Sequence, residues 1–77
     1  MKIHRVHICF IERITNFEYL VNCRVIYQPD KYKISKEAVI QFRVPEITDD
    51  IVIQCIETTL EKLEKELDFV REFNERH

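Results

Sequence analysis

The sequence predicts an α+β fold in which a three-stranded antiparallel β-meander is followed by one long C-terminal helix. Apolar and polar residues alternate in three segments of the N-terminal part, which is typical of strands with one buried face. Short polar or proline-containing turns separate these segments. In the C-terminal part the apolar residues instead recur every three or four positions, which is the period of an amphipathic helix. We therefore expect a single domain over residues 1–77, with the meander in 1–47 and the helix in 48–77.

The first two predicted strands form a hairpin around Thr15 and Asn16. The strand over residues 3–14 is expected to bury Val6, Ile8 and Phe10, and the strand over 17–27 is expected to bury its odd positions. Residues that lie opposite each other in an antiparallel pair point to the same face. A two-residue turn therefore predicts these inward pairs: Ile14 with Phe17, Phe10 with Val21, Ile8 with Cys23, and Val6 with Val25. It also predicts two outward pairs, Arg13 with Glu18 and Ile11 with Leu20, and a positive φ at Asn16.

The third predicted strand follows a turn at Pro29 and Asp30. From Ala38 to Val44 the alternation returns, and it places these residues inward: Ala38, Ile40, Phe42 and Val44. Lys36 interrupts the pattern, so the register of the first part of this segment stays open. Pro45 ends the strand because proline cannot donate a hydrogen bond to the sheet.

The helix is expected to run from about Asp49 to Asn74, with Thr48 as its N-cap. At ~1.5 Å per residue it is longer than the strands, so its C-terminal part is expected to extend past the sheet. A heptad-like row is formed by these residues: Ile53, Ile56, Leu60, Leu63, Leu67 and Val70. We expect its first half, through Leu63, to cover the sheet. Other apolar residues lie on the opposite side of the helix, namely Ile51, Cys55, Phe69 and Phe73.

Composition excludes several classes of function. The chain has no glycine, which phosphate-binding loops, dinucleotide-binding turns and nucleophile elbows require. Cys9, Cys23 and Cys55 have no CxxC spacing, so we expect neither a disulfide framework nor a zinc site. No apolar stretch is long enough to cross a membrane. The sequence therefore predicts a cytoplasmic, non-enzymatic protein without a cofactor or a metal.

Exposed apolar residues predict association. Large aliphatic side chains are expected on the outer face of the sheet, at Ile3, Ile11, Leu20, Ile26 and Val39. We therefore expect a homo-oligomeric interaction protein, of the regulator or inhibitor type, that binds another macromolecule and most simply another protein. The expected interface comprises Leu63, Leu67, Phe69, Val70, Phe73, Ile11 and Leu20.

An alternative function is nucleic-acid binding by the outer face of the sheet. Residues 1–47 carry eight Lys/Arg and five Asp/Glu, a net charge of +3, whereas residues 48–77 carry four and nine, a net charge of −5. Five cations are expected to project from that face, and a basic sheet can lie along phosphates. These cations are Arg5, Arg13, Arg24, Lys33 and Arg43.

Overall fold

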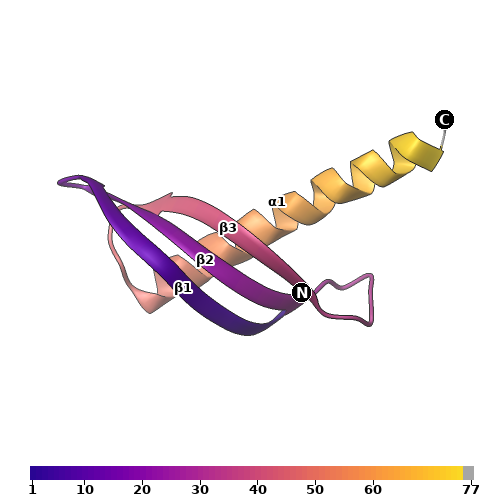
Figure 1. The fold of residues 1–77 in the computed structure, drawn as a ribbon, viewed down its shortest axis with the longest axis horizontal. Coiled ribbons are helices and arrows are strands. Elements are labelled where there is room, and N and C mark those ends of the chain that lie inside the picture. Colours follow the sequence, from indigo (N-terminus) through magenta and orange to yellow (C-terminus); the bar gives the residue numbers. More distant parts are fainter. Residues whose placement is uncertain (76–77) are drawn as a thin grey trace.

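A computed structural model describes residues 1–75 and confirms the predicted fold. A three-stranded antiparallel sheet with the order β1-β2-β3 is followed by a single long helix. The elements are β1 (Lys2–Thr15), β2 (Glu18–Gln28), β3 (Lys36–Val44) and α1 (Asp49–Glu75). The helix lies on one face of the sheet and crosses the strands obliquely, and its C-terminal part extends beyond the sheet (Figure 1). We call the face of the sheet toward α1 the inner face and the opposite face the outer face.

The helix begins where the sequence predicted, because Thr48 caps it. The backbone amide of Ile51 donates a hydrogen bond to Thr48 Oγ1 at 3.4 Å, and the amide of Val52 donates to the Thr48 carbonyl at 3.0 Å. Asp49 and Asp50 occupy the first turn, where the positive end of the helix dipole favours carboxylates. These contacts satisfy amide groups that the first turn would otherwise leave unpaired.

Pairing of β1 with β2 follows the predicted register in only one part of the hairpin. Val6 lies opposite Val25 and Ile8 opposite Cys23, as predicted. The register then shifts at Cys9, so Phe10 lies opposite Asn22 and not opposite Val21. The prediction that Phe10 faces the core is therefore wrong. An extra residue in one strand moves every following side chain to the other face, and alternation alone does not locate it.

The hairpin turn also differs from the prediction. Thr15 pairs with Glu18, so Asn16 and Phe17 form the turn, and the register shifts again at Ile14. The predicted pairs of Ile14 with Phe17 and of Arg13 with Glu18 are wrong, as is the inward position of Phe17, which is 83% exposed. Asn16 does not adopt positive φ, since no residue in the described part of the chain does. The turn is held instead by a hydrogen bond from the Phe17 amide to Thr15 Oγ1 at 3.2 Å.

Strand β3 pairs with β2 without a register shift. Val44, Phe42, Ile40 and Ala38 lie opposite Tyr19, Val21, Cys23 and Val25, which confirms their predicted inward position. Lys36 begins the strand opposite Tyr27, so this cation also belongs to the inner face. The register that the sequence left open is thereby settled.

The core lies between α1 and the two strands β2 and β3. From the helix it takes Val52, Ile56 and Leu60. Ile53, expected in the buried row, is 48% exposed, whereas Ile51 and Cys55, expected on the opposite side, are half-buried. The buried residues Val52, Ile56 and Leu60 are therefore four apart, which places them on one side of the helix, and the predicted row is wrong at its N-terminal end.

We expect Val21→Asp to unfold the protein, because Val21 is 0% exposed in the central strand and the new carboxylate would lack a partner. Burying an unpaired charge costs several kcal/mol, a large part of the stability of a domain this small. Val39→Asp places the same side chain on the outer face, where Val39 is 61% exposed, and should leave folding intact. Circular dichroism and thermal melting of both variants provide the check. A folded Val21→Asp variant would contradict the assigned inner face.

Candidate interaction surfaces

The inner face of β1 remains exposed beside a fully buried β2. Val6, Ile8 and Ile11 are 39%, 42% and 44% exposed. Their direct partners on β2, which are Val25, Cys23 and Val21, are all 0% exposed. Because paired residues point to the same face, the cover that α1 gives to β2 does not extend to these three residues of β1. We call the three exposed residues Val6, Ile8 and Ile11 the β1 strip.

The register shift at Cys9 creates this strip. Without it, Ile8 and Ile11 would point to opposite faces, since side chains alternate along a strand. The extra residue brings Ile11 opposite Val21, so the prediction that Ile11 lies on the outer face is wrong. Ile3 was also expected there, but it lies opposite Tyr27 and packs against the core.

A second group of exposed apolar side chains lies on residues 61–75 of α1, which we call the helix end, and it occupies two sides of the helix. Leu63 is half-buried, and beyond it Leu67, Val70 and Phe69 are 41%, 53% and 69% exposed. Phe73, also predicted at the interface, is exposed as well. The C-terminal part of α1 projects past the sheet in Figure 1. The exposed residues of the helix end thus lie outside the cover of their own sheet, as the helix length predicted.

A group of polar contacts fixes the direction in which the helix end leaves the sheet. The Tyr27 hydroxyl donates a hydrogen bond to Glu64 Oε1 at 2.6 Å, and Lys36 Nζ lies 3.3 Å from the same oxygen. One turn further, Lys31 Nζ donates to Asp68 Oδ2 at 2.6 Å. The Glu64 side chain is only 14% exposed. These contacts join α1 to β2, to β3 and to the loop between them.

The sequence analysis did not identify this polar group. The sequence feature that could have revealed it is Lys36, the cation that interrupts the alternation of the third strand. Lys36 lies on the inner face, where a half-buried ammonium group favours a carboxylate partner. Glu64 supplies that carboxylate, and the Tyr32 ring lies 4.7 Å from Lys36 Nζ and 5.1 Å from the Arg71 guanidinium. Burial first, and then the Glu64 carboxylate, raise the pKa of Tyr27.

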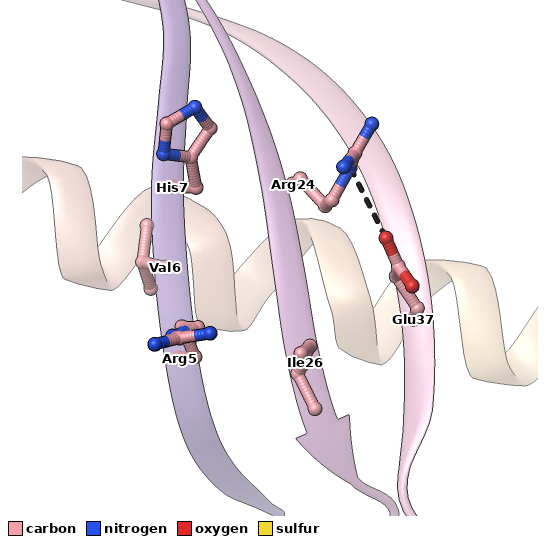
Figure 2. Close-up of a pocket in the computed structure, with 6 residues that line it drawn as sticks. All are labelled: Arg5, Val6, His7, Arg24, Ile26 and Glu37. Carbon is pink, nitrogen blue, oxygen red and sulfur yellow. Dashed lines mark ion pairs between the residues drawn. The ribbon is translucent and has the colours of Figure 1, made fainter.

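The outer face does not bring together the five cations proposed to bind nucleic acid. Figure 2 shows Arg5, His7 and Arg24 around a shallow hollow of this face, with α1 behind the strands. Arg43, opposite Leu20, shares the face. Arg13 lies opposite Tyr19 and therefore on the inner face, so its predicted outward position is wrong. Lys33 lies in the loop between β2 and β3 and not on the sheet.

Carboxylates neutralise two of the cations that do share the outer face. Arg24 Nε lies 3.1 Å from Glu37 Oε1, as drawn in Figure 2, and Arg43 Nη1 lies 3.8 Å from Glu18 Oε1. The predicted outward positions of Leu20, Ile26 and Val39 are confirmed by their pairing. This face is therefore a mixture of aliphatic groups and ion pairs, with Arg5 and His7 as its remaining basic groups near the hollow.

Within residues 1–75, no group of three or more His, Cys, Asp or Glu side chains is arranged to hold a metal ion. The three cysteines are free, with Cys9 exposed, Cys55 half-buried and Cys23 buried. No helix in this part of the chain is long and apolar enough to cross a membrane. Comparisons of the chain with protein-family models, with curated proteins and with solved structures found no match.

We expect Tyr27→Phe to lower the free energy of unfolding at neutral pH by about 1.5–3 kcal/mol, the usual contribution of a hydrogen bond to a charged group. The substitution should also change the alkaline limb of the stability profile. Folding raises the pKa of Tyr27 above its ordinary value of 10.0. Its contribution is therefore complete below pH 10.0 and is lost as the pH rises through the higher folded pKa.

Urea denaturation at neutral and at alkaline pH measures this effect, with Tyr19→Phe as the control for loss of another phenol from β2. Stability should fall less steeply above pH 10 in Tyr27→Phe than in the wild type. Parallel pH profiles for Tyr27→Phe and the wild type would rule out the proposed anchoring role of this hydroxyl.

Proposed function

We propose that the protein is a non-enzymatic interaction protein that self-associates and acts by binding another macromolecule, in the manner of a regulator or inhibitor. The observation that carries this proposal is the exposure of two apolar surfaces, the β1 strip and the helix end, on one small chain. Large contiguous apolar patches on the surface of a monomer are uncommon and typically mark sites of interaction.

The free energy that would be gained by burying the exposed apolar side chains supports association. Burying an aliphatic or aromatic side chain completely contributes about 1.5–3 kcal/mol. Ile8, Ile11, Leu67, Phe69 and Val70 each retain roughly two-fifths or more of their exposure. Covering them would contribute several kcal/mol, which is comparable with the stability of an average small domain. A partner surface therefore has a substantial driving force.

A non-enzymatic role is supported by composition, since the absence of glycine removes the turns on which many catalytic and nucleotide-binding sites depend. Nucleic-acid binding has weaker support than protein binding. Electrostatic attraction to phosphates depends on unneutralised cations, and Arg24 and Arg43 both lie beside carboxylates. A salt-sensitive mobility shift with duplex or single-stranded DNA would favour this alternative.

We expect the wild-type protein to be a dimer or a larger oligomer at micromolar concentration and to dissociate on dilution. Light scattering at several concentrations measures the mass directly. The double variant Leu67→Asp/Val70→Asp should shift the equilibrium toward monomer, because it places two charges on the exposed helix end.

The matched control is Gln54→Asp/Thr58→Asp, which adds the same charges at exposed positions on the half of α1 that covers the sheet. It should associate like the wild type, and circular dichroism should show folded protein in both cases. A wild-type monomer at every concentration would contradict self-association.

A further inference from the structure

We propose that the hollow on the outer face of the sheet binds a phosphate group, which Arg5, His7 and Arg24 hold. This site lies on the face opposite α1 and does not depend on the proposed self-association. The hollow has a volume of about 590 Å³, within the range of about 300–1,000 Å³ that is usual for small-molecule sites. These residues line it: Arg5, Val6, His7, Arg24, Ile26 and Glu37.

The pairing of β1 with β2 brings the three basic side chains together. Arg5 and His7 are two residues apart on β1 and therefore share a face. His7 lies directly opposite Arg24 on β2, and all three residues are exposed. Basic side chains that lie opposite each other in an antiparallel pair repel when both are charged. Local conflicts of this kind are expected at functional sites, and a bound anion would remove the repulsion.

The one carboxylate that lines the hollow leaves most of the basic donors free. Arg24 Nε lies 3.1 Å from Glu37 Oε1, as the dashed line in Figure 2 marks. A guanidinium group has five N–H donors, so the four on the terminal nitrogens of Arg24 remain for a ligand. Within residues 1–75, no ion pair or hydrogen bond engages the side chain of Arg5 or His7. Arg5 and Arg24 against Glu37 give the hollow a net charge of +1 before His7 is counted.

The number and placement of the donors favour phosphate over carboxylate. A guanidinium group matches either anion, but the two oxygens of a carboxylate are already matched by a single guanidinium fork. A phosphate ester carries a charge of about −1.5 to −2 and three acceptor oxygens. In Figure 2 the basic side chains come from two strands and surround the hollow from different sides. Three such groups fit an anion that accepts hydrogen bonds in three directions.

The rest of the hollow indicates that the phosphate belongs to an ester. The hollow is larger than a single phosphate group, and the half-buried Ile26 gives it an apolar surface. The second oxygen of Glu37 can accept a hydrogen bond from a hydroxyl group of the ligand. A sugar phosphate or a nucleotide has this combination of groups. The same phosphate chemistry is offered by a free nucleotide and by the backbone of a nucleic-acid strand, which the test distinguishes.

The test is a titration of the wild-type protein, followed by the NMR signals of its backbone amides. The probes are inorganic phosphate, adenosine 5′-monophosphate, adenosine, and a single-stranded oligonucleotide without terminal phosphates. Phosphate and the monophosphate should shift signals of β1 and β2 around the hollow to saturation, the monophosphate with the higher affinity, whereas adenosine should not. Arg5→Gln and Arg24→Gln should each raise the dissociation constant of the monophosphate roughly tenfold or more, because each removes charge-assisted hydrogen bonds.

The matched control is Arg43→Gln, which removes the same charge from the same face at a position outside the hollow. It should bind the monophosphate like the wild type. Circular dichroism verifies folding, and Arg24→Lys replaces Arg24→Gln if that variant unfolds. It retains the charge but not the fork, so it should still weaken binding.

The affinities of the probes decide the outcome. If the oligonucleotide binds more tightly than the monophosphate, with the same dependence on Arg5 and Arg24, the phosphate belongs to a nucleic-acid backbone. If the monophosphate binds more tightly, the ligand is a free phosphate ester. An equal loss of affinity in Arg43→Gln would show general attraction of anions and overturn the site. Binding of adenosine as tight as that of the monophosphate, or unshifted signals with every probe, would also overturn it.

Discussion

The single helix α1 covers β2 and β3 but leaves Val6, Ile8 and Ile11 of β1 open, and the rest of the structure depends on that incomplete cover. The nine buried hydrophobic residues all come from β2, β3, or α1. Strand β1 supports β2 by hydrogen bonding along one edge, yet the residues of the β1 strip stay exposed on the face that the helix covers elsewhere. The chain therefore folds with an incomplete second layer, and we attribute its proposed association to this missing cover.

The polar contacts at Glu64 support the C-terminal part of the helix, which extends past the apolar core. A helix that only packed through Val52, Ile56 and Leu60 would leave its last turns without tertiary support. Tyr27, Lys36 and Lys31 extend the attachment by two further turns, to Asp68. The exposed apolar residues beyond Leu63 consequently project from a supported helix and not from a frayed one. Structure and proposed function are connected here, because an ordered apolar surface is a better binding surface than a mobile one.

Sequence patterns predicted the strand residues that lie beneath the helix. Val21, Cys23 and Val25 in β2, and Ile40 in β3, must alternate because one face meets the helix. Strand β1 lacks that constraint, because most of its inner face does not meet the helix. Its register shifts at Cys9 and Ile14 also have no glycine or proline to mark them in the sequence. The errors at Phe10, Ile11 and Arg13 all follow from those shifts. The projection of the helix end past the sheet was predicted correctly, because the expected helix was longer than the strands. The contacts of Glu64 were missed, because its partners Tyr27 and Lys36 are distant in sequence.

The central claim is that β1 has an apolar inner face that is open in the single molecule and covered in the assembly. Methyl NMR with a soluble paramagnetic agent measures this directly, because relaxation of each methyl group reports its contact with solvent. The account predicts strong relaxation of the Ile8 and Ile11 methyl groups in dilute samples and weak relaxation in concentrated ones. Val39, on the outer face, should remain accessible throughout, and Val25 should remain protected. Ile8 and Ile11 methyl groups that are equally accessible in the associated and dissociated protein would contradict the account.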